Sequence, residues 1–416
     1  MTGGAPALTL ALATIALATD ASGQRTAAFT NGLWFTGSGF ERRTLYAVGD
    51  VLRSSAPASI DTTIDLGGRY VVPPFGEAHN HNIEGSSRVQ ARIDQYLAQG
   101  IFYIKNPNSL PSARELMAGR VNTPTSVDVV FANGGLNATD GHPTDLVKRN
   151  IARGVMKESD AEGAFYHTID DSTALEAKWP RILAGKPDFI KTYLLFSEEY
   201  AQRRNDTSYN GFKGLDPTLL PEIVRRAHSA GLRVTTHIET AADFRHALAA
   251  GVDELAHMPG YGWAGRGDSS RFELTEADAR AAAGRNVVVI TTLRITRRVG
   301  PDGEPPPEQR RREDLHRHNL NLLKRAGVRI AVGSDNYGGT AAAEAMYLNE
   351  LGVFSRLELL KLWSEMTPLT IFPDRKIGRL QDGFEASFLV LERNPLDDFS
   401  SVLRIGLRVK QGQVLR

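Results

Sequence analysis

In the middle of the chain, short runs of apolar, β-prone residues alternate with longer stretches where apolar residues recur at helical spacing. This alternation is typical of parallel strands joined by crossover helices. Eight strands are predicted, ending near His79, Lys105, Gly134, Tyr193, His237, His257, Thr292 and Asp335. Helices are predicted over 87–99, 112–119, 172–184, 217–230, 241–250, 275–283, 312–326, 341–351 and 357–365. The pattern predicts an α/β fold, a (β/α)8 TIM barrel over residues 73–375.

The two ends of the chain have a different pattern. Residues 26–72 and 376–416 contain short β-prone runs separated by turn residues such as Gly, Asp and Asn-Pro. We expect the two segments to meet in one small β-sandwich domain. The chain also lacks a P-loop and a glycine-rich dinucleotide fingerprint after the first strand of the middle region, which makes a doubly wound sheet the weaker topology.

Three segments that follow predicted strands are unusually long, namely 196–216, 259–271 and 296–312. In a barrel they would lie at the carboxyl ends of the strands, where such folds build their active sites. Long loops in compact domains are usually functional. We therefore expect these loops to shape substrate specificity.

The first residues resemble a secretory leader. Residues 6–18 are apolar and uncharged, and the small residues at 21–23 suit a cleavage site. The apolar run is too short for a stable membrane span, and no Lys or Arg precedes Arg25. We predict a signal peptide over 1–24 and a periplasmic or secreted protein; without such a leader the location would be cytoplasmic.

Composition and charge narrow the partners. The 416 residues carry 49 Lys+Arg against 48 Asp+Glu, a balance that argues against nucleic-acid binding. The basic run 310–312 is followed at once by two acidic residues and is interpreted as a solvent-exposed helix start. Cysteine is absent, so a transition-metal site must use His, carboxylate or modified Lys. The sequence leaves open whether the chain forms a homo-oligomer.

Metal-ligand residue types stand at the ends of the predicted strands. His79 and His81 are two residues apart, so on a strand their side chains face the same way. Strand ends converge in a barrel, and nitrogen and carboxylate ligands suit zinc-like ions. The predicted ligands are His79, His81, Lys191, His237, His257 and Asp335.

Lys191 needs a separate argument, because a protonated ammonium cannot ligate a metal. A lysine buried on a strand near two cations should lose its proton. The neutral amine can then add carbon dioxide to form a carbamate, which offers one oxygen to each of two ions. The alternative is a lysine that pairs with a carboxylate or binds substrate.

These residues resemble the amidohydrolase superfamily, in its binuclear branch with a carboxylated lysine. The matching features are the His79/His81 pair, Lys191, the strand-end residues His237, His257 and Asp335, and the closing β segment over 378–395. The resemblance spans residues 30–416 and is nearest to imidazolonepropionase-like and Xaa-Pro dipeptidase-like members. The segment 73–77 departs from the family, which more often has a Pro-Gly pair and an apolar-Asp step there.

The resemblance implies two divalent ions, expected to be zinc. One would bind His79, His81 and Asp335, the other would bind His237 and His257, and carboxylated Lys191 would bridge them. A metal-bridged hydroxide would attack an amide-like C–N bond of a small-molecule or short peptide-like substrate, with Asp335 as general base and then acid. The substrate-binding candidates are His142, Tyr193 and Arg294.

Three alternative functions remain at this point. A lactonase or esterase would use the same site. A mononuclear-metal deaminase would usually lack the lysine and carry Glu three residues beyond the strand-five histidine, whereas here Glu239 is two beyond His237 and position 240 is Thr. A non-catalytic scaffold of the same fold typically loses ligands, and none is missing from this sequence.

Overall fold

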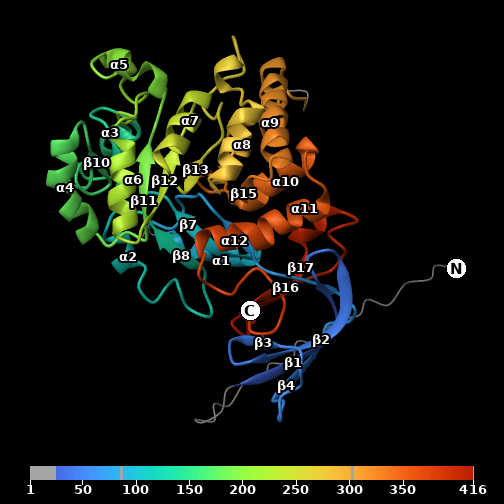
Figure 1. Ribbon diagram of the computed structural model, residues 1–416. Coiled ribbons are helices and arrows are strands. Elements are labelled where there is room, and N and C mark those ends of the chain that lie inside the picture. The colour runs from blue at the N-terminus through green and yellow to red at the C-terminus, as the bar shows by residue number, and fades with distance from the viewer. Residues whose placement is uncertain (1–24, 85–87, 301–303, 416) are drawn as a thin grey trace.

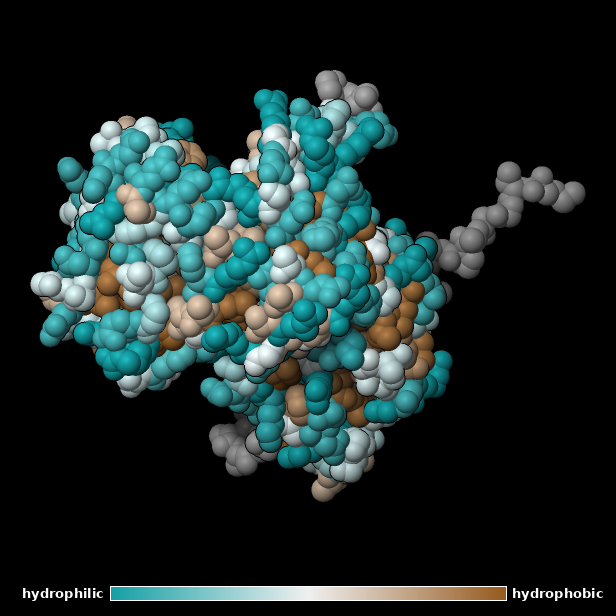
Figure 2. Space-filling model, turned by 45° about the horizontal axis from the view of Figure 1, so that its top comes forward, coloured by the Kyte–Doolittle hydropathy of each residue, from teal (hydrophilic) through white to brown (hydrophobic). Residues whose placement is uncertain are grey.

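The computed structural model describes residues 25–84, 88–300 and 304–415. The predicted signal peptide over 1–24 lies outside the described residues, so the leader and the location stay predictions. None of the described helices is long and apolar enough to cross a bilayer. Hydrophilic residues cover most of the face shown in Figure 2, and hydrophobic residues show there in small patches.

The middle of the chain forms two sheets of parallel strands. One has the order β10-β9-β11-β12-β13-β14-β15, and the other has the order β6-β7-β8. Every predicted strand end lies within three residues of an observed one. The strands are β6 (Phe75–Glu77), β7 (Ile101–Asn106), β8 (Asp128–Phe131), β9 (Gly135–Asn137), β10 (Tyr166–Thr168), β11 (Phe189–Tyr193), β12 (Arg233–His237), β13 (Glu254–Ala256), β14 (Val288–Thr291) and β15 (Arg329–Val332).

Backbone hydrogen bonds connect the two parallel sheets on both sides. The Ala78 N–H donates to the carbonyl of Val332 over 2.9 Å, which joins the end of β6 to β15. On the other side the Asp188 N–H donates to the carbonyl of Phe131 over 2.8 Å, which joins β8 to the start of β11. The predicted α/β architecture with parallel strands is confirmed.

Helices pack outside these strands (Figure 1). Local capping explains several of their bounds: Thr240 and Asp243 form a capping box before α7, and Gly251, with φ of 83°, follows its last residue. Helix α3 was not predicted. The helices are α1 (Val89–Ala98), α2 (Ala113–Leu116), α3 (Thr144–Ala152), α4 (Ser172–Ala184), α5 (Tyr200–Arg203), α6 (Leu220–Ser229), α7 (Ala241–Ala250), α8 (Glu276–Gly284), α9 (Pro307–Arg325), α10 (Ala341–Leu351), α11 (Arg356–Lys361) and α12 (Thr367–Ile371). Short 3₁₀ turns lie at Glu158–Asp160, Ser197–Glu199, Thr207–Tyr209, Ser270–Phe272, Arg294–Thr296 and Phe399–Leu403.

A π-helical turn, Leu362–Met366, separates α11 from α12 where one regular helix was predicted. Its Trp363 stacks on Phe75 with ring centroids 3.9 Å apart and donates from its indole nitrogen to the carbonyl of Gly76. A Cβ on Gly76 would lie 2.7 Å from Thr367 Cγ2. The departure from the family pattern at this position therefore has a physical reason, since only glycine lets β6 approach this helix so closely.

Strands from both ends of the chain share a third sheet. Its order is β18-β17-β16-β5-β1-β2-β3, and β4 also pairs with β1. The antiparallel pairing of β5 with β16 joins the N-terminal part to the C-terminal part. All of these strands belong to one hydrogen-bonded sheet, so the sandwich arrangement and the division into domains stay predictions. The strands are β1 (Thr26–Phe35), β2 (Phe40–Val48), β3 (Val51–Arg53), β4 (Thr62–Asp65), β5 (Tyr70–Val72), β16 (Phe388–Leu391), β17 (Ile405–Lys410) and β18 (Gln413–Leu415).

Candidate metal centre

The predicted histidine ligands converge at the ends of β6, β12 and β13. The ring centroids of His79 and His257 are 4.7 Å apart, and those of His237 and His257 are 4.5 Å apart. His81 lies 5.5 Å from His79 between ring centroids. The residues His79, His237 and His257 are each at most 2% exposed. Histidines from three strands thus form one buried cluster.

Asp335 follows β15 and completes this cluster. Its Oδ1 atom is 3.3 Å from Nε2 of His81 and 3.7 Å from Nε2 of His79, while Oδ2 is 3.9 Å from Nε2 of His257. His79, His257 and Asp335 each offer a ligand atom, and these atoms lie within 4.8 Å of one another. The group therefore fits a divalent cation. This group contains His79 from the first ligand set that the resemblance implied and His257 from the second.

The backbone is strained at two of these ligands. His257 has φ of 76° and Asp335 has φ of 47°, a left-handed conformation that few residues other than glycine adopt. Such strain persists only where surrounding contacts enforce it, and it is concentrated at functional sites. One enforcing contact is the Asp335 N–H, which donates to the carbonyl of His79 over 2.8 Å.

Lys191 lies on β11 and is 1% exposed. Its amine nitrogen has no hydrogen-bond partner among the described residues. Burial lowers the pKa of this amine to about 7, against the opposing effect of Asp335. A buried lysine without a carboxylate partner is the state that carbamate formation requires. The alternative of a lysine paired with a carboxylate receives no support.

The pKa of His81 is shifted in the opposite direction from those of the other predicted histidine ligands. Burial lowers the pKa of His237 to about 3 and those of His79 and His257 well below the usual range, so these rings are neutral, as metal ligation requires. Burial opposes a charge on His81 as well, but its contacts with Asp335 and Glu84 outweigh burial and raise its pKa to about 9. Burial raises the pKa of Asp335, but its interactions with His79, His81 and Tyr261 outweigh burial and hold this pKa well below its usual range.

Three ligand histidines have outer partners that the sequence analysis did not identify. Nδ1 of His81 lies 3.3 Å from Oε1 of Glu84, and Nδ1 of His257 lies 2.6 Å from the hydroxyl of Thr292. Nε2 of His237 lies 3.2 Å from Oε1 of Glu239. Such partners orient ligand rings and tune their basicity.

Two tyrosines at the site were also missed. The hydroxyl of Tyr261 donates to Oδ2 of Asp335 over 2.6 Å, and its ring stacks on His257 with centroids 4.0 Å apart. Tyr337 stacks on His81 at 5.5 Å and keeps 58% of its surface exposed. Tyr261 belongs to the long loop 259–271, so the length of that loop was the available signal.

The structure brings two of the three predicted substrate residues to the cluster. The ring of His142 lies 4.9 Å from His237 and 5.3 Å from Tyr193, measured between centroids. Arg294 differs, because its backbone N–H donates to Oε2 of Glu344 over 2.7 Å, while no contact joins its side chain to the cluster within the described part of the chain. Its role in substrate binding stays a prediction.

The interpretation of the basic run 310–312 as wholly solvent-exposed is wrong at Arg312. This side chain is 6% exposed and donates to the carbonyls of Tyr261 and Thr296, each over 3.2 Å. Helix α9 begins at Pro307 rather than at residue 312, and this arginine is one of its buried residues. It ties two of the long loops to the helix.

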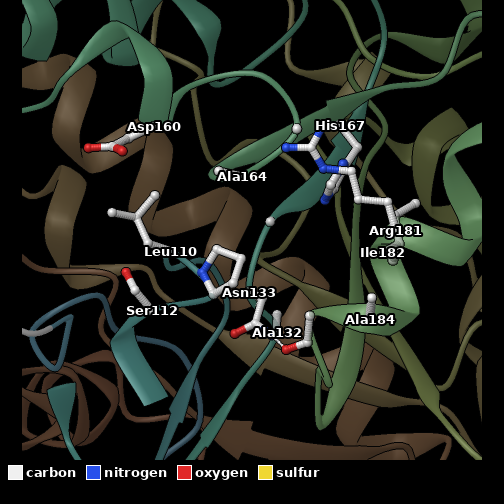
Figure 3. A pocket seen from close by; sticks show the side chains of 14 residues that line it. Leu110, Ser112, Ala132, Asn133, Asp160, Ala164, His167, Arg181, Ile182 and Ala184 are labelled. Atoms are coloured by element: carbon white, nitrogen blue, oxygen red, sulfur yellow. Dashed lines mark hydrogen bonds between the residues drawn. The ribbon is translucent and has the colours of Figure 1, made fainter. Parts of the chain in front are cut away.

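A separate cavity of about 390 Å³ lies between α2, β8, β10 and α4 (Figure 3). Arg181 extends toward it close to His167, and Asn133 lines the opposite part. Burial lowers the pKa of His167 to about 4. None of the predicted metal ligands lines this cavity, so it is distinct from the histidine cluster.

Known proteins resemble this chain over part of its sequence and in its fold. No family model matches the chain. Ochratoxinase from Aspergillus niger is 30% identical over 190 residues, which cover 45% of this chain and 38% of that protein. The match thus spans well under half the length of this relative.

Solved structures resemble the chain over almost its whole length. The crystal structure of A. niger ochratoxinase superposes with a TM-score of 0.73 at 17% identity and covers 94% of this chain and 96% of its own. An amidohydrolase gives 0.70 at 20%, covering 94% and 98%. A prolidase complexed with N-methylphosphonate-L-proline gives 0.70 at 18%, covering 94% and 99%. These matches show that the chain has the fold of these solved structures, which include an amidohydrolase and a prolidase.

Proposed function

We propose that this protein is a metal-dependent amidohydrolase that cleaves an amide-like C–N bond in a small N-acyl or peptide-like substrate. The observation that carries the proposal is the buried cluster of His79, His237 and His257 around Asp335. It is joined by the buried amine of Lys191, which has no hydrogen-bond partner among the described residues. The names of the relatives, which include ochratoxinase and prolidase, support hydrolysis of this bond type.

The scaffold proposed for this site is a closed (β/α)8 barrel. The hydrogen bonds from β6 to β15 and from β8 to β11 support closure. In that arrangement the cluster lies at the carboxyl ends of the strands, the face that carries the active sites of such barrels. The long loops that contain Tyr261 and Thr296 would then border the entrance.

The donor set fits two divalent ions of the zinc type. His79, His81 and Asp335 would hold one ion, and His237 and His257 the other, with the carbamate of Lys191 between them. When bound, such ions lower the pKa of a water molecule and polarise a carbonyl group. Binding requires His81 to lose the proton that Asp335 and Glu84 stabilise, so metal uptake would release protons.

The residues of the chain would handle the proton and the substrate. Asp335 would take a proton from the attacking water and later deliver it to the leaving nitrogen. His142 and Tyr193 lie beside His237 and would orient the scissile group. The exposed ring of Tyr337 would contact the part of the substrate that extends toward solvent.

The test is a hydrolysis screen of zinc-loaded protein prepared in bicarbonate, against N-acyl amino acids, dipeptides and lactones. We expect amide hydrolysis, two zinc ions per chain by mass spectrometry, and loss of activity with a chelator that returns on adding zinc. Activity on lactones alone would instead indicate an esterase. A metal-loaded protein that is inactive on the whole panel would overturn the proposal.

A further inference from the structure

The two carboxylate oxygens of Asp335 face different groups. Oδ1 faces the Nε2 atoms of His79 and His81, at 3.7 and 3.3 Å. Oδ2 accepts a hydrogen bond of 2.6 Å from the hydroxyl of Tyr261. If Oδ1 is the metal-facing oxygen, Oδ2 is the atom left to accept the proton of the attacking water. A phenol therefore donates to the proposed proton acceptor.

The phenol ring is fixed against the cluster. It stacks on His257 with centroids 4.0 Å apart and planes 27° apart, and it meets His237 edge-on at 5.7 Å. Its position between two predicted ligands and Asp335 leaves its hydroxyl directed at the centre of the site. A residue that only filled the loop would not need this placement.

The backbone that carries Tyr261 is anchored on both sides. Gly260 and Gly262 donate from their N–H groups to the backbone carbonyl and to Oε2 of Glu239, each over 2.8 Å. A Cβ on Gly262 would lie 2.8 Å from the same Oε2 atom. The buried guanidinium of Arg312 donates to the carbonyl of Tyr261. These contacts prearrange the phenol, so little reorganisation is needed during a reaction.

We propose, on the basis of the amidohydrolase function proposed above, that Tyr261 is a catalytic residue that donates first to Asp335 and then to the substrate oxygen. The O–H bond of water breaks, its proton passes to Oδ2, and its oxygen bonds to the carbonyl carbon. Once Oδ2 is protonated it is a poorer acceptor, and the phenol turns to the carbonyl oxygen, which now carries negative charge. When the C–N bond breaks, the proton moves from Oδ2 to nitrogen. Tyr261 keeps its own proton and changes only its acceptor.

The geometry of the attack would bring the carbonyl oxygen of the substrate within reach of the Tyr261 hydroxyl. The water oxygen must lie within hydrogen-bond distance of Oδ2, and the carbonyl carbon within one bond of that oxygen once the attack is complete. The carbonyl oxygen then lies near a phenol that already contacts Oδ2. Donors aimed at a developing oxyanion are among the larger contributors to enzymatic rates.

Tyr261→Phe tests this inference and keeps the ring that stacks on His257. The matched control is Tyr103→Phe, since the phenol of Tyr103 also donates to a carboxylate, Oε1 of Glu385 over 3.1 Å, outside the site. Three properties are measured on holoprotein. They are the zinc content, kcat and KM on the best amide substrate of the screen, and calorimetric binding of the N-methylphosphonate derivative of the amino acid that this substrate releases. In that derivative a tetrahedral phosphorus replaces the carbonyl carbon.

For Tyr261→Phe we expect unchanged zinc content, KM within about threefold of the parent, and kcat lower by roughly 100-fold. Binding of the phosphonate should weaken by a similar factor, because it resembles the transition state. Tyr103→Phe should leave kcat and phosphonate binding unchanged. An unchanged kcat in Tyr261→Phe overturns the inference, and so does a loss of zinc parallel to the loss of activity, which would show a purely structural role. If the parent protein is inactive on the whole panel, the proposed function itself fails and this inference with it.

Discussion

Two lysines are buried among the parallel strands, and their surroundings differ. Lys105 on β7 is 2% exposed, pairs with Glu254 and lies over the ring of Phe189 with its amine 4.0 Å from the centroid. Lys191 on β11 is 1% exposed and has no hydrogen-bond partner for its amine among the described residues. A buried charge is tolerated when it is paired. The surroundings of the paired lysine are those of a scaffold residue, whereas those of the unpaired lysine suit the catalytic role that we propose for it.

Two buried histidines show the same contrast between a group with a hydrogen-bond partner and a group without one. His316 on α9 is 1% exposed and lies 3.2 Å from the hydroxyl of Tyr347, which satisfies its Nδ1 atom. His79 is equally buried, and its Nδ1 atom has no partner within the described part of the chain. Burial lowers the pKa of both rings. Burial alone therefore does not distinguish a candidate metal ligand from a structural histidine. The difference is that His79 has a ring nitrogen without a partner among the described residues and lies close to other predicted ligands.

The largest expected effect is on activity in Lys191→Ala. Removing the proposed bridge should lower kcat on the order of 10⁴-fold, about 5.5 kcal/mol of transition-state stabilisation. Stability of the metal-free protein should fall because loss of the buried aliphatic stem leaves a cavity. Removal of an amine that has no hydrogen-bond partner among the described residues should offset part of this loss. Short carboxylic acids should restore part of the activity, since a carboxylate can occupy the space of the carbamate. Steady-state kinetics with and without propionate provide the measurement, and a fully active variant would refute the bridging role.

Lys105→Met should lower the stability of the protein and leave its activity nearly unchanged. Glu254 loses its partner on β7 and keeps its ion pair with Arg233, so the free energy of unfolding should fall by about 1.5–3 kcal/mol. The metal ligands remain, so activity of the folded variant at low temperature should be close to that of the parent. Urea unfolding followed by circular dichroism measures the change. Lys148→Met is the matched control, because its pair with Asp140 is solvent-exposed and should contribute less than about 1 kcal/mol. Equal losses in the two variants would contradict the contrast.

The smallest effect concerns pH and His316. Burial lowers its pKa to about 3, whereas an unfolded histidine titrates near 6.5. Between those values the unfolded chain binds a proton that the folded chain does not, so stability falls as pH falls from 6.5 towards 3. This histidine should contribute up to about 1.4 kcal/mol per pH unit to that loss. His316→Gln should reduce the slope of unfolding free energy against pH by this amount, measured by urea unfolding at pH 7, 6 and 5. An unchanged slope would show that the ring is not held neutral.

Much of the site could be predicted because it depends on local pattern. Apolar runs that end in His237, His257 and Asp335 mark strand ends, and parallel strands bring such ends together. Glu239 and Thr292 could not be assigned as partners, since the sequence does not report which imidazole nitrogen faces which side chain. Arg312 was misjudged because its burial depends on hydrogen bonds to the carbonyls of Tyr261 and Thr296, which only packing brings close to it.

At Gly76, too, the sequence shows the feature, but only the packing of the fold explains it. The sequence shows a glycine where the family more often has a larger apolar residue, but only the packing of Trp363 and Thr367 against β6 explains it. Likewise the pattern predicted one helix over 357–365, and the π-helical turn depends on that same contact.

By itself the sequence determined the α/β class, the order of the parallel strands along the chain and the residue types that stand at their ends. These follow from periodicity and from the chemistry of individual side chains. The tertiary structure alone decided which buried bases have partners and that Tyr261, 74 residues from Asp335 in the chain, donates to Oδ2 of this aspartate. The physical reason is that pairing depends on distances between atoms that are remote in sequence, and only packing sets those distances.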